Sequence, residues 1–263
     1  MYIINTDDLL FDAISFAREA GRIQLDKFRK GDLGAQAKIN NSDIVTLVDK
    51  ASEESIIGNI QSKYPTHSIL SEEAGEHFKS NSDYEWVIDP LDGTTNYNAG
   101  LPIFSVSIAI KHHNETLIGV VYAPYLNELF HAIKGEGAYL NGNKISVSQT
   151  TVLEKAVVGT GFPVDKMLTT DNNVDNFRTI LPLTRAIRRL GSAAIDISYV
   201  AAGIFDAFWE INLHEWDVQA ALLIAKEAGA EYEFFRSDRN ISVLVGNPTI
   251  KKCISPLLSR MPG

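Results

Sequence analysis

Only one cysteine, Cys253, is present among the 263 residues, so the chain cannot form a disulfide within itself. This scarcity fits a reducing compartment, and we expect a cytoplasmic protein. No apolar run reaches the roughly 18 residues that a membrane-spanning helix needs. The first residues also lack the basic and apolar regions of a secretory signal. We therefore expect no membrane partner.

Positive charge is scarce as well, because 24 Lys and Arg stand against 33 Asp and Glu, a net charge of −9. Proteins that bind nucleic acid or anionic membranes normally carry a basic excess, so the composition argues against a nucleic-acid partner. An acidic chain also repels a phosphorylated substrate unless bound cations reverse the local sign. The length suits one large domain or two tightly joined halves.

The hydrophobic pattern predicts helices on either side of a strand-rich middle. Apolar residues at helical spacing follow an N-cap at Thr6 and predict a first helix to about Phe28. Further helices are expected from near 49, near 171–180, at 193–202 and at 218–228. Strands are expected at 67–70, 85–88, 104–111, 117–122, 128–133, 137–140, 156–159, 185–189 and 208–210. This order predicts a layered protein of the mixed α/β or α+β class.

The segment Trp86-Val87-Ile88-Asp89-Pro90-Leu91-Asp92-Gly93-Thr94-Thr95-Asn96-Tyr97 is the most informative part of the sequence. An apolar strand runs into Asp89, and Pro90 is expected to stop it because proline lacks a ladder donor. Asp92 follows three residues later, and residues 93–95 open a helix whose free N–H groups favour an anion. Hard oxygen ligands beside an anion site suit Mg²⁺ and a phosphate group.

Two other metal or phosphate chemistries do not fit this segment. An EF-hand loop needs acidic or amide residues at alternate positions, and Leu91 interrupts that pattern. Phosphatases that attack with an aspartate have one residue between their two aspartates, whereas two residues separate Asp89 from Asp92. On its own, the segment also matches an ordinary Asp-Gly turn, since short motifs of this kind arise by chance.

Three further stretches offer matching groups, and the first two also have an ordinary structural explanation. Glu72 follows a short apolar strand and is a candidate metal ligand or a solvated surface carboxylate. Asp217 lies near the start of an apolar helix and is a candidate ligand or a helix cap. The Gly191-Ser192-Ala193-Ala194 stretch is a helix start suited to an anion or a hydroxyl group.

Taken together and in order, these segments closely resemble the inositol monophosphatase family, over about residues 8–250. The matching segments are Asp43-Ile44-Val45-Thr46 with Asp49, Ser71-Glu72-Glu73, residues 89–97, Gly135-Glu136-Gly137-Ala138, Gly191-Ser192-Ala193-Ala194 and His214-Glu215-Trp216-Asp217. The resemblance implies a layered α-β-α-β-α sandwich of the inositol monophosphatase and fructose-1,6-bisphosphatase type. It also implies one catalytic domain over 1–263, with halves at about 1–145 and 146–263, and assembly as a homodimer.

The resemblance further assigns roles to individual residues around two or three Mg²⁺ ions per subunit. Glu72, Asp89 and the Leu91 carbonyl are expected to hold one ion, and Asp89, Asp92 and Asp217 a second. Glu72 is expected to share a weaker third ion. Lys38 lies on a loop that approaches the metals in relatives.

The resemblance also assigns the attacking water, the phosphate and the rest of the substrate. Thr94, oriented by Asp49, is expected to position the attacking water. The expected substrate contacts are Asp92, Gly93, Thr94, Thr95, Gly191, Ala193, Glu210 and Asp217.

Several positions carry no clear assignment from sequence. The stretch Gly159-Thr160-Gly161-Phe162-Pro163 resembles bacterial members of the family but has no assigned contact. The six histidines show no metal-ligand spacing, and His214 is expected to pack rather than ligate. Arg185, Arg188 and Arg189 are candidates for a subunit interface or for pairing with surface carboxylates, and the pairing is favoured.

The expected activity is Mg²⁺-dependent hydrolysis of a small polyol or sugar phosphate, with inositol 1-phosphate favoured because Glu210 suits vicinal hydroxyls. Fructose 1,6-bisphosphate, histidinol phosphate and 3′-phosphoadenosine nucleotides remain open, since substrate choice in the family rests on a few loop contacts. A regulatory role that binds the transcription machinery is the non-enzymatic alternative.

Overall fold

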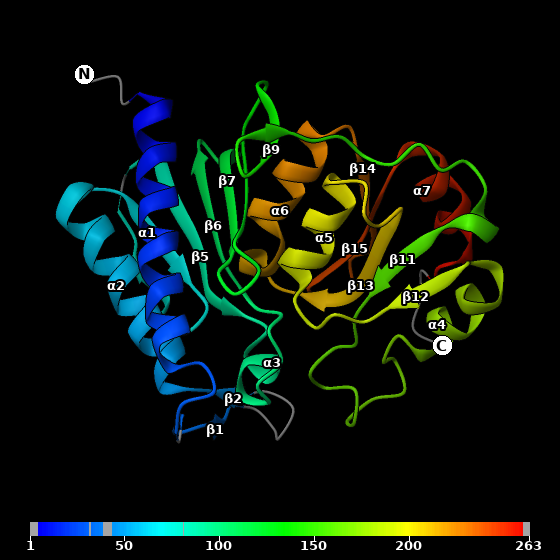
Figure 1. Cartoon of the computed structure of the whole chain (residues 1–263), viewed down its shortest axis with the longest axis horizontal. Helices are drawn as coiled ribbons and strands as arrows, with labels where there is room; N and C mark the ends of the chain where they lie inside the picture. The colour runs from blue at the N-terminus through cyan, green and yellow to red at the C-terminus, as the bar shows by residue number, and fades with distance from the viewer. Residues whose placement is uncertain (1–4, 32, 39–43, 81, 260–263) are drawn as a thin grey trace.

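The structure is a computed structural model that describes residues 5–31, 33–38, 44–80 and 82–259. Its layers alternate as helix, sheet, helix, sheet and helix (Figure 1). The expected α-β-α-β-α sandwich is therefore confirmed. Of the matching segments, Asp43 lies outside the described residues. Within the described part of the chain, no helix has the length and apolarity to cross a lipid bilayer.

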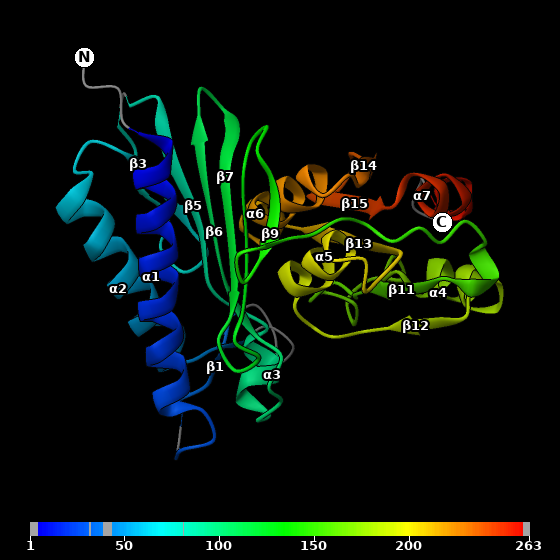
Figure 2. The same ribbon diagram turned by 45° about the horizontal axis from the view of Figure 1, so that its top comes forward.

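Helices α1 (Thr6–Lys27) and α2 (Leu47–Lys63) form the first layer and pack against one face of the first sheet (Figure 2). The expected N-cap at Thr6 is wrong by one residue, because the Asn5 side chain accepts from the backbone N–H of Asp7. Helix α2 begins at Leu47 because Thr46 caps it and Asp49 closes a capping box.

The first sheet has eight strands in the order β10-β9-β8-β7-β6-β5-β3-β4, antiparallel except for the β3–β5 pair. Its strands are β3 (Ser68–Ser71), β4 (Gly75–Phe78), β5 (Tyr84–Asp92), β6 (Ser105–His112), β7 (Glu115–Ala123), β8 (Glu128–Ile133), β9 (Gly137–Leu140) and β10 (Asn143–Lys144). A small separate pair joins β1 (Gln36–Ala37) to β2 (Ile44–Val45). The short helix α3 (Thr94–Asn98) follows β5 directly.

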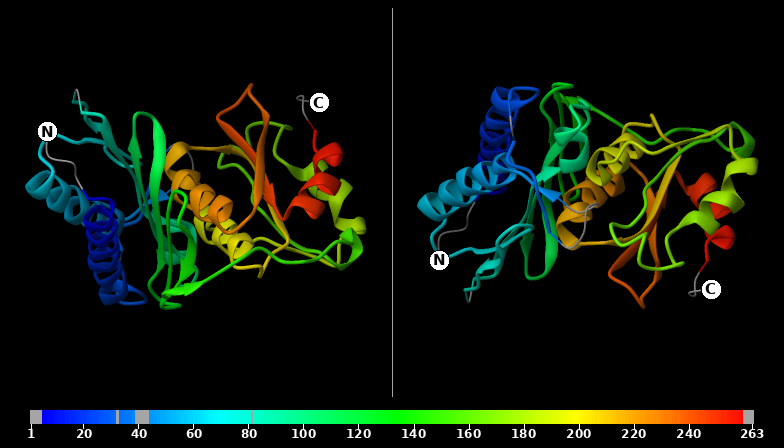
Figure 3. Two further views of the ribbon diagram at one scale, coloured as in Figure 1. Left: turned by 90° about the horizontal axis from the view of Figure 1, so that it is seen from above. Right: turned by 90° about the horizontal axis from the view of Figure 1, so that it is seen from below.

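Helices α5 (Ala193–Ala201) and α6 (Glu215–Glu227) form the middle layer between the two sheets, as the views from above and below also show (Figure 3). Gly119 of β7 allows close packing of α6, since an added Cβ there would overlap the Ala220 carbonyl. The two helices are almost wholly apolar on their inner faces and share one core with both sheets.

The second sheet has five strands in the order β12-β11-β13-β15-β14. Its strands are β11 (Val157–Thr160), β12 (Ala186–Arg188), β13 (Ala207–Leu213), β14 (Glu231–Arg236) and β15 (Ile241–Gly246). Helices α4 (Val174–Ile180) and α7 (Pro248–Ile254) cover its outer face. One-turn 3-10 helices lie at Leu153–Lys155, Leu181–Leu183 and Ser255–Leu257. The elements β14, β15 and α7 were not predicted from the sequence.

Candidate active site

The end of β5 carries the first two carboxylates of the site. The expectation that Pro90 stops this strand is wrong, because β5 continues to Asp92 through a register shift between Asp89 and Asp92. The shift places Pro90 outside the regular pairing with β6, and its carbonyl instead accepts from Gln24 Nε2 at 2.7 Å. The irregularity allows a proline in a central strand and turns both aspartates into the site.

Asp92 joins the two halves of the fold. Its Oδ2 accepts from Ser192 Oγ at 2.5 Å and from the Ala194 backbone N–H at 2.8 Å, both at the start of α5. Burial raises the pKa of Asp92 to about 6, although these hydrogen bonds act to lower it. The N-terminus of α5 thus holds one oxygen of a carboxylate that comes from the other sheet.

Asp89, which is buried, and Asp217, which is partly buried, lie close to Asp92 and to its negative charge. Burial raises the pKa of Asp89 well above its usual range, and the charges of Glu72, Asp92 and Asp217 raise it further. Asp217 is the third residue of α6, and its Oδ2 accepts from the His214 backbone N–H at 2.7 Å. Burial also raises the pKa of Asp217 well above its usual range, with Glu72 as the next cause.

Glu72 is held at the end of β3 and pairs with the nearest lysine. Its backbone N–H donates to the Ile88 carbonyl at 3.1 Å, and its Oε1 lies 2.8 Å from Lys38 Nζ. Lys38 also pairs with Glu73. Burial lowers the pKa of Lys38, but the two carboxylates outweigh that effect and raise it above its usual value. Lys38 therefore stays charged and partly neutralises this side of the cluster.

Asp49 and Thr94 form a hydrogen-bonded pair beneath the cluster. Thr94 Oγ1 lies 2.8 Å from Asp49 Oδ1 and 3.0 Å from the Leu91 carbonyl oxygen. Asp49 Oδ2 accepts from the Thr46 backbone N–H at 2.8 Å and from Thr46 Oγ1 at 2.5 Å. Burial raises the pKa of Asp49, whereas the hydrogen bonds from Thr46 and Thr94 lower it.

A cavity of about 350 Å³ opens above these groups. The predicted residues that line it are Glu72, Asp92, Gly93, Thr94, Thr95, Gly191, Ala193, Glu210 and Asp217. Asp49, Asp89 and Leu91, which are at most 2% exposed, lie below this surface. The structure thus brings all the predicted site residues to one region, and they come from both sheets and from the starts of α3, α5 and α6.

Glu210 faces the cavity from β13. Burial raises the pKa of Glu210 to about 8, and the positive charge of Arg189 opposes that rise. The structure gives a role to Gly161, which belongs to the stretch 159–163 that had no assigned contact. An added Cβ at this position would overlap the Glu210 carboxylate. Beside it, Thr160 Oγ1 donates to the Trp209 carbonyl at 2.8 Å, which ties β11 to β13. The missing side chain of Gly161 therefore provides the space for Glu210.

Two residues of the cavity were missed by the sequence analysis. Arg189, expected to pair with surface carboxylates, lines the cavity near Gly191. Asp196 of α5 also lines it and is 1% exposed, and burial raises its pKa well above the usual range. Among the described residues, Asp196 Oδ1 has no hydrogen-bond partner. Neither residue lies in a motif that separates it from ordinary helix or loop residues.

The donor set fits Mg²⁺. The carboxylates of Glu72, Asp89, Asp92 and Asp217 are hard oxygen ligands, which Mg²⁺ prefers. Burial and the neighbouring negative charges raise the pKa values of Asp89 and Asp217, so the charged cluster needs a cation. Lys38 and Arg189 supply too little positive charge to balance them, even with Lys166 at the cavity wall.

The comparisons with known proteins agree with this geometry. The family model described as inositol monophosphatase family matches residues 5–258. Nus factor SuhB of Salmonella typhimurium is 39% identical over 250 residues, covering 94% of each chain. Nus factor SuhB of Pasteurella multocida is 45% identical over 218 residues, covering 82% of this chain and 81% of the relative.

A solved structure supports the same assignment at the level of the fold. An inositol monophosphatase from Anabaena superposes with a TM-score of 0.87 and 36% identity, covering 98% of each chain. The match includes both sheets and all the helical layers, since nearly the whole chain is covered. With a buried carboxylate cluster at the junction of those layers, the chain belongs to the inositol monophosphatase family.

Proposed function

We propose that this protein is a Mg²⁺-dependent phosphatase that hydrolyses the phosphate monoester of a small polyol, with inositol 1-phosphate as the preferred substrate. The observation that carries the proposal is the cluster of buried carboxylates beside one cavity, whose pKa values are raised by burial and by one another. The family membership supports the same reaction class.

Five oxygen donors would hold two or three Mg²⁺ ions: the carboxylates of Glu72, Asp89, Asp92 and Asp217, and the Leu91 carbonyl. When bound, Mg²⁺ neutralises phosphate charge, stabilises the leaving oxygen and makes water more acidic. The protein's own contribution is to fix these donors. Asp92 is fixed by Ser192 and Ala194, and Asp217 by the His214 N–H.

Thr94 and Asp49 would orient the attacking water. Asp49 Oδ1 accepts the Thr94 hydroxyl hydrogen, so a lone pair of Thr94 Oγ1 is directed at the attacking water. As water attacks phosphorus in line with the ester oxygen, its proton would pass to Thr94 Oγ1 while the Thr94 hydrogen passes to Asp49. The P–O ester bond breaks, and the leaving alkoxide takes up a proton from a solvent water molecule. No covalent bond to the protein is needed, because positioning and charge neutralisation supply most of the rate enhancement.

The cavity wall offers separate contacts for phosphate and for hydroxyl groups. Gly93 and Thr95 flank Thr94 at the turn into α3, where backbone N–H groups suit phosphate oxygens. Glu210 and the Ala193 backbone, with Gly191 beside them, lie across the cavity and suit the hydroxyls of a polyol. We also propose that the protein acts as a homodimer.

The test is phosphate release with and without Mg²⁺ from four substrates: inositol 1-phosphate, fructose 1,6-bisphosphate, histidinol phosphate and 3′-phosphoadenosine 5′-phosphate. Strong Mg²⁺-dependent turnover of inositol 1-phosphate supports the proposal. Preference for another compound keeps the reaction class and replaces the substrate. A folded protein that releases phosphate from none of the four contradicts the proposed activity.

A second function is favoured by the relatives that bear the name Nus factor. At 39–45% identity, that name supports an association of this chain with the transcription machinery, alone or beside the phosphatase activity. The net charge of −9 makes a protein surface a better partner than bare RNA. Binding to purified RNA polymerase elongation complexes tests this role, and an Asp92→Asn variant separates binding from catalysis.

A further inference from the structure

A group of potential metal ligands lies at the opposite end of β5 from the active site. Asp83 precedes β5, His112 is the last residue of β6, and His113 follows it in the turn to β7. One ligand atom from each of the three residues lies within 4.8 Å of the others. The sequence shows no metal-ligand spacing among the histidines, and this group emerges only in the fold because Asp83 is distant from the histidine pair in sequence.

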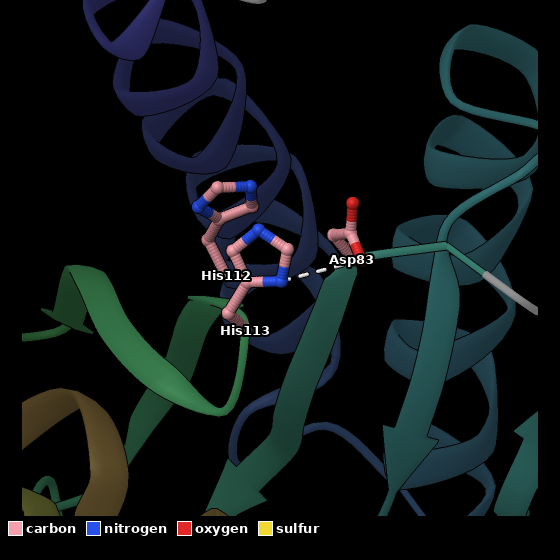
Figure 4. Close-up of side chains that lie close together, drawn as sticks. All are labelled: Asp83, His112 and His113. Carbon is pink, nitrogen blue, oxygen red and sulfur yellow. Dashed lines mark ion pairs between the residues drawn. The ribbon is translucent and has the colours of Figure 1, made fainter.

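The sheet itself holds the three residues together. Tyr84 and His112 are paired in the β5–β6 ladder, and the His113 backbone N–H donates to the Asp83 carbonyl at 2.9 Å. The His112 ring packs on the Tyr84 ring, with centroids 4.5 Å apart, and on the His113 ring at 4.1 Å. Figure 4 shows the two imidazole rings side by side, with the Asp83 carboxylate next to the His113 ring. The arrangement is thus set by backbone pairing and ring packing.

The distance between the ligand atoms of His113 and Asp83 suits two ligands of one tetrahedral ion. His113 Nδ1 lies 3.3 Å from Asp83 Oδ1. Two ligands of a tetrahedral Zn²⁺ ion with bonds of about 2.0–2.1 Å are about 3.3 Å apart. A contact of this kind between two exposed side chains, with 65% and 53% of their surfaces accessible, would gain little stability by itself.

We propose that Asp83, His112 and His113 form a surface site for one divalent transition-metal ion of the Zn²⁺ class. Imidazole nitrogen favours such ions, whereas Mg²⁺ prefers an all-oxygen shell, so the site differs in selectivity from the carboxylate cluster. Asp83 and Asp89 are separated by six residues of extended strand, about 20 Å at about 3.3 Å per residue. The two sites are therefore independent, and this one does not rest on the phosphatase function.

Binding would fasten the β6–β7 turn to the beginning of β5. The turn residues His113 and Asn114 both have left-handed backbone angles, with φ of +50° and +64°. This is the type I′ geometry of a two-residue hairpin, which asparagine adopts more readily than most residues. The protein would supply three ligands and leave the remaining position to water, as in open zinc sites.

The experiment is calorimetric titration of the full chain with Zn²⁺ in excess Mg²⁺, for the wild type and the variants Asp83→Asn, His112→Gln and His113→Asn. Asparagine suits the left-handed position of residue 113, so His113→Asn removes a ligand without straining the turn. Asp175→Asn is the matched control, because Asp175 is also an exposed carboxylate paired with one cation, Arg178. Zinc bound at the carboxylate cluster is common to all five proteins and cancels in the comparison.

The proposal requires that the wild type and Asp175→Asn bind one Zn²⁺ ion per chain at this site. The affinity of that binding should fall at least tenfold in both histidine variants. Zinc should also shift the imidazole NMR signals of His112 and His113, and Mg²⁺ should leave them unchanged. Identical zinc isotherms for all the proteins would overturn the site. Half an ion per chain would overturn it as well, since that stoichiometry indicates an ion shared between two copies.

Discussion

Thr94 Oγ1 lies 2.8 Å from Asp49 Oδ1, and this bond links the start of α3 to the first turn of α2 across the base of the cavity. Asp49 is fully buried and is fixed at its other oxygen by Thr46. The carboxylate therefore sets the direction of the Thr94 hydroxyl hydrogen. The oxygen lone pairs of Thr94 are left for a water molecule.

Replacing Thr94 with valine should lower kcat about a hundredfold or more, because general base assistance typically contributes 10²–10⁴-fold. KM should change less than kcat, since the backbone of residue 94 and the other expected substrate contacts remain. Valine has nearly the same shape as threonine, so the loss should come from the hydroxyl. Thr94→Ser is the control and should retain most of the activity, and steady-state kinetics on inositol 1-phosphate distinguish the two. Equal activity in Thr94→Val and wild type would contradict the water-positioning role.

Asp92→Asn should lower turnover by orders of magnitude and leave the fold intact. The amide oxygen can still accept from Ser192 and Ala194, but the negative charge that would hold Mg²⁺ is lost. The thermal stabilisation produced by Mg²⁺ should also shrink, because the stabilisation from a bound ligand increases with the logarithm of its affinity for the folded state. Calorimetry with Mg²⁺ or EDTA measures this, with Asp175→Asn as a surface control. A fully active Asp92→Asn protein would rule out the assignment of Asp92 as a metal ligand.

Gly161→Ala should impair substrate binding without a large loss of stability. The new Cβ would overlap the Glu210 carboxylate, so that side chain must move out of its position at the cavity. We expect KM to rise more than kcat falls, because Glu210 would contact the substrate's hydroxyls and not the phosphate. Steady-state kinetics on the four substrates measure the changes in KM and in kcat separately.

Gly58→Ala is the matched control for this experiment. Gly58 lies inside α2, and an added Cβ there meets nothing within 4 Å. Alanine should therefore stabilise the helix by about 0.5–1 kcal/mol and leave kinetics unchanged. If both alanine variants show the same kinetics, Gly161 does not make room for Glu210 in the working enzyme.

The candidate ligand positions could be located in the sequence because each lies in a short local pattern. Asp89 and Asp92 follow one strand and Asp217 lies in the first turn of a helix, but each pattern alone also fits an ordinary turn or cap. The roles as metal ligands were therefore expected only from the resemblance of the segments, taken in order, to the family. Asp196 could not be predicted, because an aspartate in the first turn of a helix looks like an ordinary dipole partner. Its place in the cavity depends on how α5 packs between the sheets.

In the fold, too, features encoded locally could be predicted, and features set by packing between distant segments could not. The amphipathic helix α1 was predicted to within one residue at its start, because its apolar stripe and its cap are encoded locally. The strand β15 is a mostly apolar, buried run between β14 and the sequence-distant β13, and β14 lies at the edge of the sheet. Periodicity does not distinguish such a buried run from a helix segment. The continuation of β5 past Pro90 depends on an irregular register that no local rule encodes.

Glu210 should make the metal-free protein less stable at alkaline pH. Burial raises the pKa of this carboxyl to about 8 in the folded state, from a usual value of 4.5. The folded state therefore binds the proton more tightly than the unfolded chain does. This contribution is fully present below about pH 4.5 and is lost as the pH rises through about 8. Asp89, Asp196 and Asp217 act in the same direction, because burial raises the pKa of each.

The variant Glu210→Gln isolates this one contribution, since glutamine cannot ionise and is close in size to glutamate. In EDTA, the melting temperature of the wild type should fall more steeply between pH 6 and pH 9 than that of Glu210→Gln. Glu154→Gln, a substitution at an exposed position, should retain the steep slope of the wild type. Parallel slopes in all three proteins would mean that Glu210 is already ionised at pH 6. Arg189 would then neutralise the carboxylate more strongly than burial opposes its charge.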